Sequence, residues 1–173
     1  MSNREKLLYI FVALSSSIFI LESFIPRPLP WIKLGLSNVI TVLLIYFFPL
    51  NFVLKVVVYR VVIGSIFSAS LFTPSFFLSF SGGISSAVAM FLAKKFFDKF
   101  FSSIGISIIG AETHIFTQLL VVYKFIIKDA DIFKLTPYLI IFSLITGLII
   151  GIISLKVIED FEKFYNEYLS SSL

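Results

Sequence analysis

The chain has 173 residues, of which 58% are hydrophobic and 14% are charged, and its mean hydropathy is +1.04. This composition lies outside the range of soluble domains and predicts one integral membrane domain over residues 1–173. The formal net charge of +4 does not predict nucleic-acid binding, because the Lys and Arg residues lie mostly in predicted loops and helix ends, as they do in membrane proteins.

Long stretches without Lys, Arg, Asp or Glu indicate where the chain crosses the membrane. One stretch of 33 residues covers 61–93, and two stretches of 21 residues cover 34–54 and 135–155. A hydrocarbon core about 30 Å thick requires roughly 20 apolar residues per helical crossing. The longest stretch therefore contains parts of two crossings, separated at Thr73-Pro74.

Proline residues divide the chain into six apolar segments, because proline cannot continue a helix. Pro26, Pro28 and Pro30 end the first segment, Pro49 ends the second, and Pro74 follows the third. The expected helices span residues 6–24, 32–48, 52–71, 75–97, 103–126 and 137–158. The sequence thus predicts an all-α fold, a bundle of six transmembrane helices.

The distribution of basic residues predicts the orientation of this bundle. With the N-terminus inside, eight Lys and Arg residues lie on the cytoplasmic side, five lie outside, and Arg60 lies within the membrane. We therefore expect a multi-pass protein of the cell membrane with both termini in the cytoplasm. Arg4 and Lys6 precede the first apolar run as in a signal peptide, but no clear small-x-small cleavage site follows before Pro26. This run is expected to remain as the first helix.

Arg60, Glu112 and His114 are the ionisable residues expected at membrane depth. A charged side chain there costs at least about 2.5 to 3.5 kcal/mol and normally faces the bundle interior or a cavity. Arg60 lies about 13 Å along the third helix from Asn51, and Glu112 reaches a similar depth on the fifth. We therefore predict an intramembrane ion pair between Arg60 and Glu112. The alternative is that Arg60 contacts an anionic substrate through its guanidinium.

A polar strip is expected on the fifth helix. His114, Thr117 and Gln118 share one face through i, i+3 and i+4 spacing, whereas Glu112 points about 160° away from His114. The strip either lines a cavity or makes hydrogen bonds between helices. A lone His is no metal signature, and the absence of Cys excludes disulfides and thiolate metal sites, so no metal or cofactor is expected.

Small residues spaced four apart form notches that allow another helix to approach closely. Ala13 and Ser17 form such a notch on the first helix, and Gly147 and Gly151 form one on the sixth. The fourth helix also carries many small side chains, and these favour close helix packing over ligand contact. Its small residues are Ser79, Ser81, Gly82, Gly83, Ser85 and Ser86.

Several motifs together resemble a family of small integral membrane proteins labelled heptaprenyl diphosphate synthase component I, also called the Gx transporter family. The resemblance covers about residues 7–158 and is carried by residues 22–38, 59–65, 73–75, 79–83 and 110–111, followed by His114 and Gln118. The family pattern often has Asn directly after the His, whereas this chain has Ile115, so no polar role is carried over to that position.

That family is in turn similar to the substrate-binding S components of energy-coupling factor (ECF) transporters. The resemblance implies six helices, cytoplasmic termini and a substrate pocket that opens outward beneath the first external loop. For this pocket we expect substrate contacts from five residues: Lys33, Asn38, Arg60, His114 and Gln118. Their basic and hydrogen-bonding character favours an anionic or hydrogen-bonding small molecule.

The same resemblance assigns the notch of Ala13 and Ser17 to docking on a transmembrane coupling subunit. The chain has no Gly-x-x-x-x-Gly-Lys loop for nucleotide phosphates, so transport driven by ATP would require separate ATPase subunits. The expected partners are therefore a small-molecule substrate, a coupling subunit, ATPase subunits and membrane lipid.

The family label also suggests prenyl diphosphate synthesis, which requires clustered carboxylates to hold Mg²⁺ against a diphosphate. The four aspartates are scattered, and no Asp-Asp-x-x-Asp motif occurs. We therefore expect that the chain is not itself an enzyme. The alternative function is a membrane accessory subunit of a polyprenyl diphosphate synthase or of an isoprenoid or quinone pathway, and a third is a structural or electron-transport accessory protein without a ligand.

The predicted orientation is testable with Cys substitutions, because the natural chain has no Cys. The distribution of basic residues places Arg27 outside and Lys95 inside. In intact cells, an impermeant thiol reagent should label Arg27→Cys and not Lys95→Cys. The reverse pattern would overturn the orientation.

Overall fold

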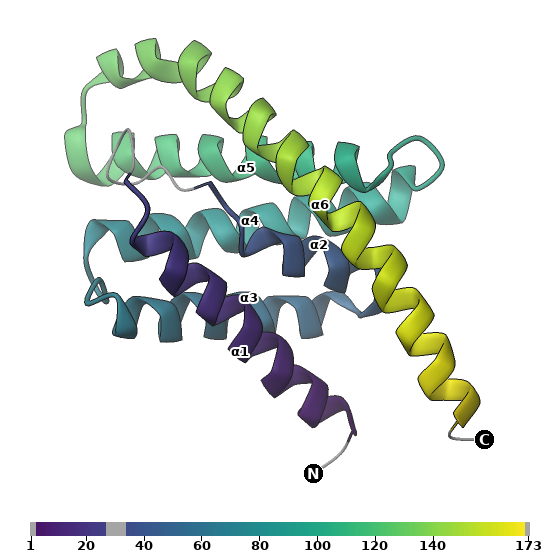
Figure 1. Ribbon diagram of the computed structural model, residues 1–173. Helices are drawn as coiled ribbons and strands as arrows, with labels where there is room; N and C mark the ends of the chain where they lie inside the picture. Colours follow the sequence, from purple (N-terminus) through teal and green to yellow (C-terminus); the bar gives the residue numbers. More distant parts are fainter. Residues whose placement is uncertain (1–2, 27–33, 172–173) are drawn as a thin grey trace.

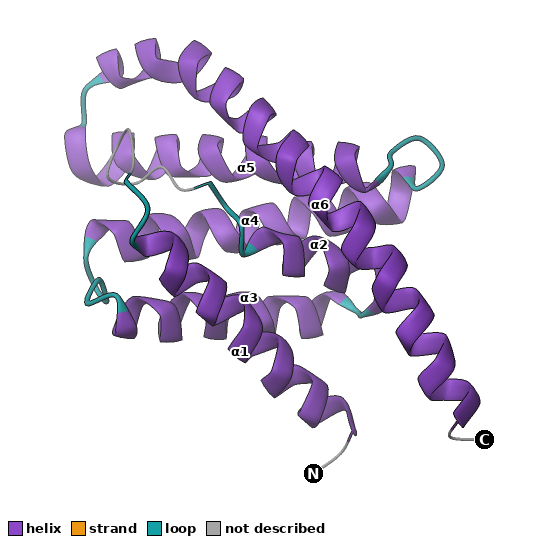
Figure 2. Cartoon of the chain, in the orientation of Figure 1, coloured by secondary structure: helices purple, strands orange, loops and turns teal. Residues whose placement is uncertain are grey.

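A computed structural model describes residues 3–26 and 34–171, and Figure 1 shows that these residues form a helical bundle. Figure 2 shows helices joined by loops, with no strand in these two ranges. The helices are α1 (Asn3–Ser23), α2 (Asn38–Phe47), α3 (Leu50–Phe67), α4 (Pro74–Phe97), α5 (Ser103–Val122) and α6 (Thr136–Ser171). A π-helical turn, η1 (Tyr123–Ile127), and a 3-10 turn, η2 (Ala130–Leu135), connect α5 to α6.

Proline and hydroxyl residues mark several helix starts, as the sequence indicated. Pro49 directly precedes α3, and Pro74 is the first residue of α4, where its missing N–H leaves no helical hydrogen bond unmade. Thr73 and Ser102 precede α4 and α5 in extended backbone conformations. The all-α prediction is confirmed, and the boundaries of α1, α3, α4 and α5 lie within a few residues of those expected.

Five helices are long and apolar enough to cross a membrane, namely α1, α3, α4, α5 with η1, and η2 with α6. Large apolar side chains cover the outward face of α6, where Ile141, Ile145 and Ile149 are 58%, 54% and 47% exposed. Exposed aliphatic residues in such a row are the normal surface of a helix that faces lipid. The chain is a multi-pass membrane protein.

The second predicted crossing is shorter than expected. Residues 34–37 form a turn instead of continuing the helix, and α2 begins only at Asn38. With 10 residues, α2 is about 15 Å long at 1.5 Å per residue, roughly half the thickness of a bilayer core. Five of the six expected crossings are therefore long enough to span a bilayer, and α2 is not.

Helix α2 tolerates this shortness because it lies at the centre of the bundle. It contacts α1, α3, α4, α5 and α6, and its residues 39–45 are all buried. A helix that is apolar on every side is typical of such an enclosed position. Backbone that is not helical is tolerated at membrane depth where protein contacts satisfy it, and in the turn before α2 the N–H of Gly35 and the carbonyl of Ser37 bind Glu22 and Arg60.

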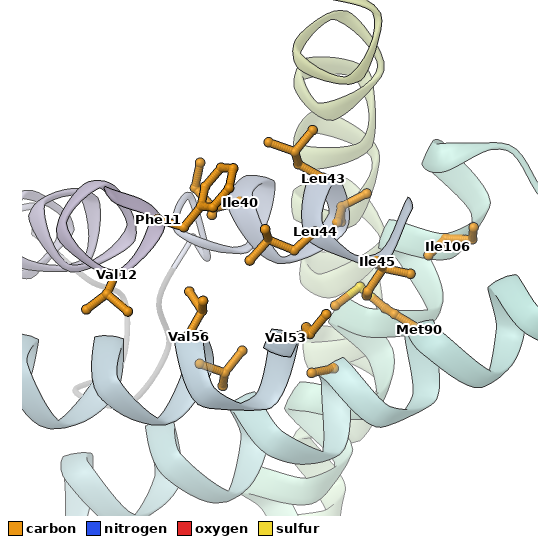
Figure 3. Close-up of a cluster of buried hydrophobic side chains, with 13 residues drawn as sticks. Phe11, Val12, Ile40, Leu43, Leu44, Ile45, Val53, Val56, Met90 and Ile106 are labelled. Carbon is orange, nitrogen blue, oxygen red and sulfur yellow. The ribbon is translucent and has the colours of Figure 1, made fainter. Parts of the chain in front are cut away.

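The largest apolar cluster surrounds α2 (Figure 3). Leu44 and Ile45 point from α2 toward α3, α4 and α5, whose Val53, Met90 and Ile106 complete the cluster. Leu44, Val53 and Ile106 have no exposed surface. The core is therefore built from long-range contacts to one short helix.

Helix α6 extends to Ser171, well beyond the expected end at residue 158. Aromatic contacts hold this extension against the bundle, since the ring of Phe161 packs edge-on against Phe11 at 5.8 Å and Phe47 at 5.0 Å. Such pairs add about 0.5 to 1.5 kcal/mol beyond area burial. The contacts connect α6 to α1 and α2.

Both termini lie at one end of the bundle in Figure 1, together with the α2–α3 and α4–α5 connections. The C-terminal end of α1 and the α3–α4 and α5–α6 connections lie at the opposite end. This arrangement agrees with termini on one side of the membrane, and the identity of that side stays a prediction.

The glycine notch of α6 is filled within the chain. A Cβ atom on Gly147 would lie 2.8 Å from the Cα of Ile108, and one on Gly151 would lie 2.5 Å from the Cα of Ile104. Both distances are to the backbone of α5, so α5 and α6 pack backbone against backbone here. This notch is not available to a partner protein.

Gly151→Ala should destabilise the protein by about 1 to 3 kcal/mol, because the new methyl group must push α5 away. Gly105→Ala is the matched control, since its Cβ would meet only Phe101, a side chain that is 38% exposed and able to move. Unfolding midpoints in detergent measure both. Equal midpoints for the two variants would contradict the backbone contact.

Candidate functional site

A small cavity lies where all six helices meet. Its volume is about 40 Å³, which is space for roughly three water molecules. The wall includes Glu22 from α1, Asn38 from α2, Arg60 from α3, Ser79 from α4 and His114 from α5, and Phe142 and Thr146 come from α6. Charged and polar side chains therefore line an interior that is otherwise apolar.

Arg60 is the central basic group of this cavity and is 3% exposed. Its guanidinium donates hydrogen bonds to the carbonyl oxygen of Ser37 at 2.7 Å, to Oγ1 of Thr41 at 3.0 Å and to Oδ1 of Asn38 at 3.2 Å. The three acceptors belong to the start of α2. Among the described residues, Nε of Arg60 has no hydrogen-bond partner.

Glu22 is the acidic group of the cavity, and the sequence analysis did not select it as a site residue. It is 2% exposed, and its Oε1 accepts a hydrogen bond from the backbone N–H of Gly35, whereas Oε2 has no partner among the described residues. The signal that would have found it is a carboxylate in the last turn of an apolar helix, four residues before Pro26.

Gly35 is required at this point for two reasons. Its φ of +80° is left-handed, a conformation that residues with a side chain rarely adopt. A Cβ there would also lie only 3.1 Å from Nδ2 of Asn38. The turn at Gly35 thus places its own N–H on Glu22 and holds Asn38 near Arg60.

The glycines of α4 make room for the polar residues of the neighbouring helices. A Cβ on Gly82 would lie 2.9 Å from Nε2 of His114, so only glycine lets the imidazole lie against α4. Gly83 packs against α3, since a Cβ there would lie 3.2 Å from Cγ1 of Val57 and in ordinary contact, at 3.8 Å, with the Arg60 guanidinium. The expected role of these glycines in close packing therefore also shapes the wall of the cavity.

His114 lines the cavity, and Gln118 lies behind it. The amide nitrogen of Gln118 is 3.0 Å from Nε2 of His114, and Gln118 is 1% exposed. Gln118 therefore orients the imidazole and does not itself line the cavity. Thr117, on the same helix face, takes part in a hydrogen bond of 2.8 Å to Ser85 of α4, so the strip includes one contact between helices.

The predicted ion pair between Arg60 and Glu112 is wrong. Glu112 instead accepts a hydrogen bond of 2.8 Å from Oγ of Ser143 on α6, and it lines a separate groove between α5 and α6. Arg60 and Glu112 were expected at a similar depth in the membrane, but their charges do not meet, because Glu112 points away from the cavity that His114 faces. The carboxylate that lines the same cavity as Arg60 is that of Glu22.

The remaining predicted residues fall into three groups. Asn38, Arg60 and His114 are brought together at the cavity. Lys33 lies outside the described residues. Ala13 and Ser17 lie on the exposed surface of α1, away from the cavity. In the described ranges no group of three His, Asp or Glu residues is arranged to hold a metal ion.

These features define a polytopic helical membrane protein that encloses a small polar cavity. The sequence profile of the family described as heptaprenyl diphosphate synthase component I matches residues 11–157, and the chain belongs to that family. A protein described as a component belongs to a system of several subunits, which implies partner proteins. No curated protein and no solved structure shows significant similarity to the chain.

Because Arg60 and Glu112 do not touch, their substitutions should act independently. Arg60→Gln should lower the free energy of unfolding by at least about 1.5 kcal/mol, since it removes hydrogen bonds from a charged donor to buried acceptors. Adding Glu112→Gln should change stability by the sum of the single effects, within about 0.5 kcal/mol. Unfolding measurements on all four proteins test this. Recovery of stability in the double variant would show that the residues do interact.

Proposed function

We propose that this chain is the substrate-binding subunit of an ECF-type transporter and captures a small molecule in the cavity around Arg60. The observation that supports this most is the incomplete pairing of two buried charged groups that line one cavity, Glu22 and Arg60. Buried charges are normally satisfied completely when their role is structural, because an unpaired charge in an apolar interior is costly.

The position of the cavity supports uptake from one face. Glu22 lies in the last turn of α1, so the cavity lies toward the bundle end at which α1 ends. The termini lie at the opposite end (Figure 1). With the predicted cytoplasmic termini, this end faces the outside of the cell, as the family resemblance implies for an S component.

The exposed notch on α1 supports docking to a partner helix. Ala13 and Ser17 are both exposed and lie on one face with Ile10, Leu14 and Leu21, three apolar residues that are at least half exposed. Unlike the notch of α6, this one is not filled by another helix of the chain. A coupling subunit packed here would leave the cavity untouched, and separate ATPase subunits would supply the energy.

The alternative proposal is a membrane accessory subunit of a polyprenyl diphosphate synthase. The description of the family is the observation that favours it. In this role the chain would supply no prenyl transfer chemistry of its own, since the sequence contains no Asp-Asp-x-x-Asp motif. The exposed notch would then hold the synthase partner or its membrane anchor.

Ala13→Trp separates the two proposals, because a large side chain in the notch blocks the approach of a partner helix. Under the transporter proposal, co-purification with coupling and ATPase subunits and uptake into cells should both fall at least tenfold. Ligand that co-purifies with the isolated subunit, measured by native mass spectrometry, should persist. Ile145→Trp, at a position of α6 that is 54% exposed, is the matched control and should leave all three unchanged.

Two outcomes would contradict the transporter proposal. One is unchanged uptake by Ala13→Trp together with loss of a prenyl synthase partner, which would establish the accessory-subunit alternative. The other is a purified wild-type protein that carries no small molecule and binds none.

A further inference from the structure

Two buried groups of opposite charge line the same cavity without forming an ion pair. Glu22 and Arg60 are 2% and 3% exposed, and both line the cavity of about 40 Å³. No nitrogen–oxygen pair of these two described residues lies within 4.0 Å. Opposite charges attract strongly in an interior of low dielectric constant, so two such groups normally close into direct contact.

Separate anchors hold the two groups apart. Arg60 is fixed by the Ser37 carbonyl, Asn38 and Thr41, and Glu22 is fixed by the N–H of Gly35. Each group keeps one unsatisfied polar atom among the described residues, the Nε–H donor of Arg60 and the Oε2 acceptor of Glu22. Both side chains belong to the wall of one cavity, which therefore lies between a cation and an anion.

We propose that the cavity binds a small zwitterion, with its anionic group on Arg60 and its ammonium group on Glu22. This inference rests on the proposed substrate-binding function. A zwitterion satisfies both groups and adds no net charge to the interior. A simple anion, one of the ligand classes that the sequence favoured, would pair with Arg60 and place a second negative charge near Glu22.

The size of the cavity limits the ligand to a compact molecule. Its volume is about 40 Å³, and a neighbouring cavity of about 20 Å³ shares the wall residues Leu34, Asn38, Ala111 and Thr146 with it. Phe19 and Phe142 form apolar parts of the wall and leave room for a short hydrocarbon portion only. Amino acids with the shortest side chains carry both charges in the smallest volume.

The test compares three molecules of similar size that differ in charge. L-alanine is the zwitterion, propionate lacks the ammonium group, and ethylamine lacks the carboxylate. Binding to the full-length protein in detergent is measured by calorimetry. L-alanine should bind at least about tenfold more tightly than either analogue, since each lost partner removes a hydrogen bond between charged groups.

Substitution of Glu22 should remove one part of this preference, that for L-alanine over propionate. Glu22→Gln keeps the shape and the Oε1 acceptor but removes the charge, so the preference for L-alanine over propionate should fall at least tenfold. Glu112→Gln is the matched control outside the cavity and should leave the ratio unchanged. Glu22→Asp keeps the charge and should retain a preference for the zwitterion. Its ratio of L-alanine to propionate affinity provides a second test if Glu22→Gln does not fold.

The wild-type ratio alone already decides the inference, and equal binding of L-alanine and propionate would overturn it. A co-purifying ligand with a single charge, identified by native mass spectrometry, would also overturn it and leave the proposed substrate-binding function standing. Binding of none of the three molecules would likewise overturn the inference, and the proposed substrate-binding function would then be decided by the search for a co-purifying ligand.

Discussion

The arrangement of the whole bundle depends on how the buried guanidinium of Arg60 is satisfied. A cation at membrane depth must find acceptors within the protein, and Arg60 finds three at the start of α2. These hydrogen bonds fix the turn at residues 34–37 against α3 and so place α2 at the centre, where its apolar residues form the core. The polar cavity and the apolar core are thus two consequences of one interaction.

Much of the fold could be predicted from the sequence, because proline and charge-free length act locally. Pro49 and Pro74 mark the helix starts of α3 and α4 that the structure contains. The short α2 was not predicted, because Leu34 to Ser37 are uncharged and no proline separates them from the helix that follows. The turn there depends on Glu22 and Arg60, contacts that no local pattern encodes.

The candidate site could be predicted only in part. Arg60 and His114 were found because ionisable residues are rare in apolar helices, and both line the cavity. The Glu112 pairing failed because periodicity gives the depth of a residue and its direction relative to its own helix, but not how that helix is rotated toward its neighbours. Glu22 was missed because a carboxylate at a helix end resembles an ordinary residue of the membrane surface.

The enclosure of α2 has a consequence for how the chain enters the membrane during its synthesis. A helix about 15 Å long cannot span the bilayer alone, and the turn before it exposes backbone groups that lipid cannot satisfy. The side chains that form hydrogen bonds with the backbone of this turn come from the two neighbouring helices. Glu22 lies on α1, before the turn, and Arg60 lies on α3, after α2. We therefore expect α1, α2 and α3 to leave the translocation machinery as one cooperative unit, with α2 retained at the protein-conducting channel until α3 is complete.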